Sequence, residues 1–69
     1  MSVGRILVKV RDTREYMGTY LDATNGWARG ESGTEPSPSF LRFRRLTMAA
    51  YNALTELEEE LERSIERRK

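Results

Sequence analysis

The amino-acid sequence predicts an α+β fold, in which a small antiparallel β-meander of three to four strands precedes one long C-terminal α-helix. Two periodicities support this fold class. Apolar and polar residues alternate near the N-terminus, as in a half-buried strand, whereas after residue 47 apolar residues recur every three or four positions, as on one face of a helix. With 69 residues, the chain is expected to form a single small domain over 1–69 with little core.

The first predicted strand covers residues 3–11. Ile6, Val8 and Val10 fall on one of its faces, and the opposite face is mostly charged. Since successive side chains of a strand point to opposite faces, this alternation predicts that the apolar face covers the core.

Two structures compete for residues 12–26. A helix would start at Asp12 and stop before Asn25-Gly26, with tyrosines stacked along one side. Against the helix stand Gly18 and Thr19 in its middle, because both residue types are unfavourable there and the local Tyr, Thr and Met content suits strands. We therefore favour strands and keep the helix as the alternative.

In the favoured arrangement, Asn25-Gly26 is a two-residue hairpin turn, and residues 1–29 form the meander. The third strand is short and lies at residues 27–29. The run over residues 8–19 is similar to the first hairpin of Sm-like RNA-binding barrels, which supports the hairpin. Because Thr13 stands where that family has glycine, the likeness is taken as a shared hairpin and not as membership of the family.

The second half begins with residues 30–39, which are rich in Gly, Pro and Ser and are predicted to form an exposed loop. Ser39 and Thr47 are both acceptable caps for the C-terminal helix. Three arginines soon after Ser39 would oppose the helix macrodipole if the helix began there. We therefore expect residues 40–46 to be a strand or extended segment and residues 47–69 to be the helix.

The residue types present exclude most enzyme classes. The chain contains no cysteine and no histidine, so it has no disulfide, no thiolate nucleophile, no imidazole base and no zinc site of the Cys/His type. The glutamates cluster along one helix, where nothing nearby in the sequence shapes a pocket, and no glycine-rich phosphate loop is present. We predict a protein that is not an enzyme, without catalytic residues, metal site or cofactor.

A basic and aromatic set of residues suggests nucleic-acid binding, because arginines pair with phosphates and exposed aromatic rings stack on bases. The candidate binding residues are Arg42, Arg44, Arg45, Trp27, Arg29, Arg11 and Arg14. The leading function is therefore a small regulatory protein that presents this surface to DNA or RNA. The alternative is a protein–protein adaptor or inhibitor, of the type encoded by phages and mobile elements, with the same residues on an acidic protein partner.

The C-terminal helix carries a narrow apolar stripe that predicts self-association. A helix from residue 48 to residue 69 would be about 33 Å long, which exceeds the height of a sheet built from the remaining residues. Part of the helix would therefore project and bury its stripe against a helix of another copy. The predicted oligomerisation residues are Leu54, Leu57, Leu61 and Ile65.

The charges also alternate in blocks. Residues 40–46 hold three arginines and no acidic residue, whereas residues 47–62 hold five glutamates and no basic residue. Such blocks suggest pairing between segments or between chains, and a solvated helix face explains them equally well. No apolar run has the length of a membrane span and no export signal is evident, so we expect a cytoplasmic protein that does not contact membranes.

Overall fold

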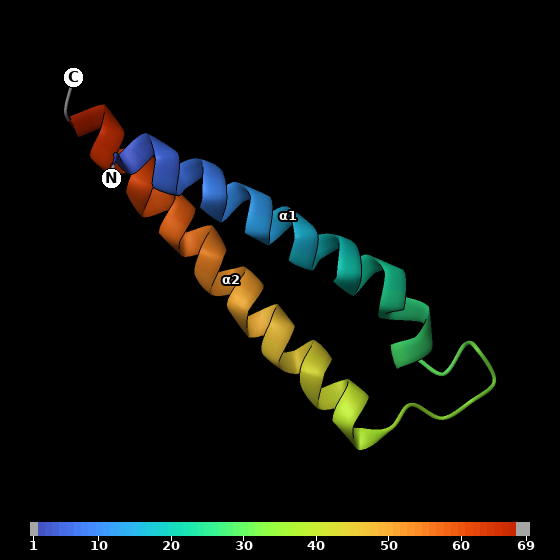
Figure 1. The fold of residues 1–69 in the computed structure, drawn as a ribbon. Helices are drawn as coiled ribbons and strands as arrows, with labels where there is room; N and C mark the ends of the chain where they lie inside the picture. The colour runs from blue at the N-terminus through green and yellow to red at the C-terminus, as the bar shows by residue number, and fades with distance from the viewer. Residues whose placement is uncertain (1, 68–69) are drawn as a thin grey trace.

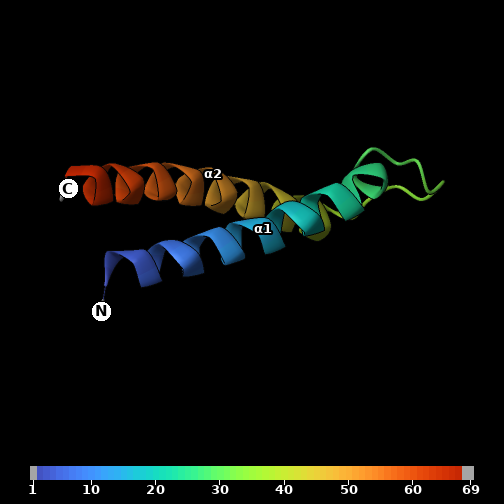
Figure 2. The same cartoon turned by 90° about the horizontal axis from the view of Figure 1, so that it is seen from above.

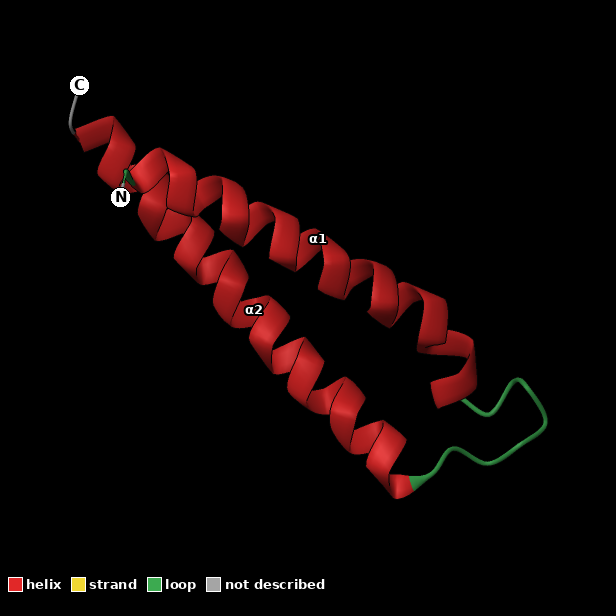
Figure 3. Ribbon diagram, viewed as in Figure 1, coloured by secondary structure: helices red, strands yellow, loops and turns green. Residues whose placement is uncertain are grey.

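The computed structural model describes residues 2–67 as two long antiparallel helices, α1 (Val3–Ala28) and α2 (Pro38–Arg67). Residues 29–37 connect them, and the start of α1 and the end of α2 lie at the end of the rod opposite this loop (Figure 1). The described residues contain helix and loop and no strand (Figure 3). The predicted α+β fold with a β-meander is therefore wrong, and the chain is an α-helical hairpin measuring 53 × 17 × 15 Å.

Helix α1 replaces the strand predicted over residues 3–11. Val10 is 7% exposed but Val8 is 54% exposed, so the two residues do not share a buried face. The residues that face α2 are instead spaced alternately by four and three positions, which is the repeat of a helix packed along another helix. They are Val3, Leu7, Val10, Arg14, Met17, Leu21, Thr24 and Ala28. The alternation at the N-terminus is a short coincidence within this longer repeat.

Residues 12–26 are also helical, so the predicted hairpin, which the likeness to Sm-like barrels supported, is wrong. The helical alternative has the right element type but the wrong bounds, because α1 runs through Asp12 and continues past Asn25-Gly26 to Ala28. Gly18 allows a close approach of the two helices: a Cβ atom added there would lie 3.2 Å from Cε2 of Tyr51. The threonine hydroxyls are satisfied inside the helix, since each donates to the carbonyl four residues earlier, at 2.8 Å for Thr13, 3.0 Å for Thr19 and 2.8 Å for Thr24. Packing and local hydrogen bonds therefore offset the weak helix propensity of this segment.

Both ends of α1 are capped by residues that the sequence argument did not use. The hydroxyl of Ser2 accepts a hydrogen bond from the backbone N–H of Arg5 at 3.2 Å. At the other end Asn25-Gly26 continues the helix, and Gly30 takes the left-handed conformation with φ +76°. The N–H of Gly30 bonds the carbonyl of Trp27 at 3.1 Å, and the N–H of Glu31 bonds the carbonyl of Gly26 at 3.0 Å. This is a Schellman motif, which places the turn four residues later than predicted. The third strand predicted over residues 27–29 is wrong, because residues 27 and 28 belong to α1 and Arg29 is its C-cap.

Helix α2 starts at Pro38, and the strand predicted over residues 40–46 is wrong. Ser37 is its N-cap, because its hydroxyl accepts from the N–H of Phe40 at 3.2 Å, and proline suits the first helical position. With this start, Arg42 and the arginines that follow it lie beyond the first turn, where the macrodipole no longer opposes them. Residues 68 and 69 of the helix predicted over 47–69 lie outside the described residues.

The two helices bury little between them. They cross at a shallow angle when seen from above (Figure 2). Of the hydrophobic side chains within residues 2–67, only Leu7 and Val10 are less than 9% exposed. The face of α2 toward α1 follows the same four-and-three spacing and includes polar residues: Phe40, Arg44, Thr47, Tyr51, Leu54, Glu58, Leu61 and Ile65. Neither helix, as far as residues 2–67 go, combines the length and the apolar content that crossing a membrane requires.

Candidate protein-interaction surface

One long side of the hairpin is polar and is held by ion pairs between the helices. Nε of Arg11 lies 3.1 Å from Oε1 of Glu58, and its Nη2 lies 2.7 Å from Oε1 of Glu62. Nη2 of Arg14 lies 2.7 Å from Oε2 of Glu58. The carboxylates of Glu62 and Glu58 raise the pKa of Arg11 above its ordinary value. Because this pKa lies far above neutral pH, Arg11 is charged there. The stability that its ion pairs contribute would be lost only as the pH rises through the pKa.

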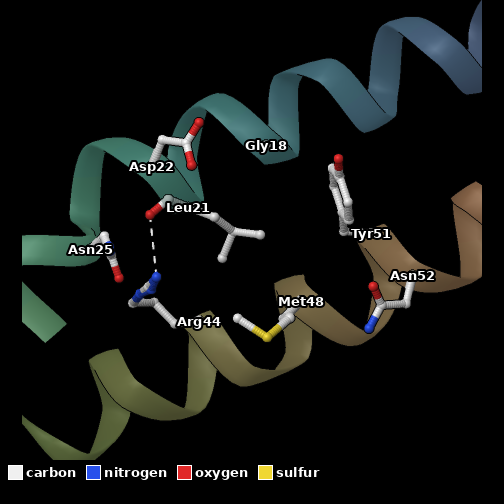
Figure 4. A pocket seen from close by; sticks show the side chains of 8 residues that line it. All are labelled: Gly18, Leu21, Asp22, Asn25, Arg44, Met48, Tyr51 and Asn52. Atoms are coloured by element: carbon white, nitrogen blue, oxygen red, sulfur yellow. Dashed lines mark hydrogen bonds between the residues drawn. The ribbon is translucent and has the colours of Figure 1, made fainter.

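The same side carries an open cavity of about 370 Å³ near the middle of the rod (Figure 4). The guanidinium of Arg44 reaches across from α2, and its Nη2 donates to the carbonyl of Leu21 at 3.2 Å. Arg44 is only 8% exposed, and its Nε has no partner among the described residues. Asp22 and Asn25 line the cavity from α1. The arrangement ties the helices together and presents no nucleophile–base pair.

The structure does not gather the predicted nucleic-acid-binding residues into one surface. Three of the arginines are engaged in ion pairs, namely Arg11, Arg14 and Arg29, the last with Glu31 at 3.3 Å. Arg44 is buried between the helices. Only Arg42, Arg45 and Trp27 of that set are both exposed and without an ion pair in the described part of the chain. Within the predicted set, exposed arginines without an ion pair among residues 2–67 are thus limited to Arg42 and Arg45 near the start of α2.

The stripe predicted to mediate self-association divides between two sides of α2. Leu54, Leu61 and Ile65 are partly buried on the side that faces α1 of the same chain. Leu57 is 42% exposed and points away from α1. An apolar contact between copies would therefore use a different set of residues, of which Leu57 is one.

The side opposite the ion pairs carries exposed apolar and aromatic residues from both helices, which we call the apolar–aromatic face. Tyr16 is 78% exposed, Trp27 is 60% exposed and Phe43 is 61% exposed, which is unusual for side chains of this size. The rings of Trp27 and Phe40 lie 6.4 Å apart between centroids at the loop end of this face. The apolar–aromatic face comprises Tyr16, Tyr20, Trp27, Phe43, Leu46 and Leu57.

Helix geometry places these six residues on the same side. A shallow hollow there is lined by Tyr16, Met17 and Tyr20 of α1 and by Thr47 of α2, which puts the tyrosines on the Thr47 side of the hairpin. At 3.6 residues per turn, Phe43 and Leu46 of α2 both lie beside Thr47, on the side of the helix away from the polar cavity. Leu57 lies on that same side, about three turns after Leu46. The polar cavity lies on the other side of the hairpin.

A signal for this face was present in the sequence. In α1, Tyr16, Tyr20, Ala23 and Trp27 follow one another by four, three and four positions, which is the spacing of a second apolar stripe beside the one that faces α2. The strand interpretation separated Trp27 from Tyr16 and Tyr20 by a turn at Asn25-Gly26, so it did not predict one continuous stripe from Tyr16 to Trp27.

The described residues hold no group of three or more acidic side chains that could bind a metal ion. Comparisons with protein-family models, curated proteins and solved structures give no match to this chain.

Proposed function

We propose that this protein is a small protein-interaction module of the adaptor or inhibitor class, and that it binds through the apolar–aromatic face. The observation that carries the proposal is the placement of three large aromatic side chains, each at least 60% exposed, on one side of a two-helix rod. Contiguous apolar surface of this kind usually marks a site for another protein. Tyrosine and tryptophan are also the residues most enriched among those that dominate binding energy.

The arrangement favours a helical partner. Parallel rows of apolar side chains on two adjacent helices leave a shallow hollow between them, and an amphipathic helix can lay its own apolar stripe there. The hollow beside Tyr16, Tyr20 and Thr47 has a volume of about 240 Å³, which suits individual side chains of such a helix.

Nucleic-acid binding has weaker support, because only Arg42 and Arg45 among the candidate arginines are exposed and outside ion pairs within residues 2–67. Two adjacent positive charges give a small electrostatic attraction to phosphates. The sequence pI of about 8.1 is also below the value above 9 that is typical of nucleic-acid-binding domains. The absence of enzymatic activity and the cytoplasmic location expected from the sequence remain predictions.

A selection from a displayed library of amphipathic helical peptides tests the proposed function. We expect the wild-type chain to enrich helices with an apolar stripe, and we expect Phe43→Glu to abolish their binding. Met48→Glu is the matched control, because Met48 is also exposed and on α2 but lines the polar cavity on the other side. A library that yields no peptide sensitive to Phe43→Glu would count against the proposal.

A parallel titration with DNA and RNA oligonucleotides at low salt, followed by Trp27 fluorescence, tests the other class. The proposal predicts no saturable binding. Saturable binding would overturn the proposal in favour of nucleic acid if it depends on these arginines. In that case the slope of log affinity against log salt concentration should fall by about one unit when Arg42 or Arg45 is changed to Ala.

A further inference from the structure

The hairpin exposes more surface than a compact chain of its mass. Its accessible surface is 5493 Å², whereas a compact monomer of 8.0 kDa exposes about 4,450 Å². The difference, about 1,000 Å², is close to the surface of about 800 Å² that each partner buries in a standard protein–protein interface. One side of the rod therefore has room for a partner of similar size.

The interior of the hairpin is too small to hold the fold firmly by itself. Leu7 and Val10 are the only hydrophobic residues below 9% exposure among residues 2–67, and none of the side chains there is fully buried. Small natural domains with so little core often add disulfides, a structural metal or oligomerisation. The chain has no cysteine or histidine, which leaves oligomerisation as the available source of further burial.

The charges on the exposed side of α2 favour an antiparallel neighbour of the same kind. Arg42 and Arg45 lie near the start of the helix, and the exposed Glu56 lies further along it. None of the three has an ion-pair partner within the described chain. Two α2 helices packed antiparallel bring the basic start of each beside the acidic part of the other, whereas parallel packing brings like charges together.

We infer that a second copy of this chain covers the apolar–aromatic face, in a twofold dimer in which the two α2 helices pack antiparallel. The inference rests on the proposed function, because it names the partner of that same face. A twofold axis joins the same patch on both copies, so opposite charges meet twice. Between Leu46 and Leu57 the exposed side of α2 carries the small residues Ala50 and Ala53, which let two helix backbones approach closely.

Sedimentation equilibrium on the full chain tests the dimer. We expect the wild type to be dimeric at micromolar concentration and Leu46→Glu to weaken the dimer by at least about a hundredfold, since two charges enter an apolar contact. Met48→Glu, on the other side of α2, should remain dimeric. Circular dichroism establishes that both variants stay helical.

A charge exchange tests the antiparallel arrangement with variants that leave the apolar residues intact. Arg42→Glu and Glu56→Arg should each weaken the dimer by roughly tenfold, because each places two like-charge pairs across the twofold axis. An equimolar mixture of the two variants should associate as tightly as the wild type, since both cross-pairs are then complementary again.

The outcomes separate this inference from the proposed function. A wild type that stays monomeric up to millimolar concentration overturns the dimer, and selection of helical peptides would still support the interaction module. A dimer that Met48→Glu disrupts and Leu46→Glu does not overturns the assignment of the face. A charge-exchange mixture that associates no better than its components overturns the antiparallel arrangement.

Discussion

Replacement of Glu58 with Ala should destabilise the hairpin more than any other single loss of a carboxylate. Glu58 is 9% exposed, lies on the face of α2 toward α1, and pairs with both Arg11 and Arg14. Removal of one partner from a fully buried ion pair costs about 3–5 kcal/mol, and an exposed pair contributes about 0.2–1 kcal/mol. The side chains of the two arginines are 49% and 29% exposed, so they regain water when the carboxylate is lost. We therefore expect Glu58→Ala to lower the free energy of unfolding by about 1–2 kcal/mol.

The measurement is urea unfolding followed by far-UV circular dichroism, at one protein concentration because dimerisation would add to the apparent stability. Glu60→Ala is the matched control: Glu60 pairs with Arg63 on the solvent side of the same helix, and its loss should cost about 0.5 kcal/mol or less. The double replacement Arg14→Met with Glu58→Leu should be at least as stable as the wild type, since apolar residues at both positions extend the contact between the helices. Equal effects of Glu58→Ala and Glu60→Ala would show that the ion pairs of Glu58 between the helices do not stabilise the hairpin more than an exposed pair does.

Three further predictions concern helix ends and the contact between the helices, and all are checked by the same unfolding measurement. Gly30→Ala should lower the free energy of unfolding by about 1 kcal/mol, because Gly30 has φ +76°. Gly4→Ala, in a helical position with open space around it, should be neutral or stabilising, and the opposite order of stabilities would contradict the Schellman cap. Ser37→Ala should cost about 1 kcal/mol through loss of the N-cap of α2, and no change would argue for a later helix start. Gly18→Leu should lower the free energy of unfolding by about 1–3 kcal/mol, because the leucine side chain would occupy the space of the Tyr51 ring. An unchanged stability would show that the helices do not meet there.

The sequence contained more information about the fold than the alternation at its N-terminus suggested. Val8 and Val10 fit a strand only over a few residues, whereas the four-and-three spacing from Val3 to Ala28 extends through the whole of α1. That longer repeat is hard to recognise because Arg14 and Thr24 occupy two of its positions. Polar residues at these places are stabilised by partners distant in the sequence or by a backbone carbonyl, which local propensity does not report.

Other features depended on contacts that sequence patterns do not contain. Gly18 weakens a helix considered alone, and only the ring of Tyr51 beside it explains why glycine suits that position. Asn25-Gly26 has the sequence of a hairpin turn, yet the chain turns at Gly30, where a Schellman motif satisfies the last carbonyls of α1. The candidate site changed with the fold, because ion pairs to Glu58 and Glu62 engage Arg11 and Arg14, and Tyr16 and Trp27 come onto one face.

The dimer is tested most directly by an isotope-filtered nuclear Overhauser experiment on an equimolar mixture of labelled and unlabelled chains. This measurement detects only contacts between protons of different copies. The dimer predicts intermolecular contacts from the ring protons of Phe43 and the methyl protons of Leu46, and none from Met48 on the opposite side of α2. Intermolecular contacts confined to Met48 and the polar cavity, or none at millimolar concentration, would contradict the claim that a second copy covers the apolar–aromatic face.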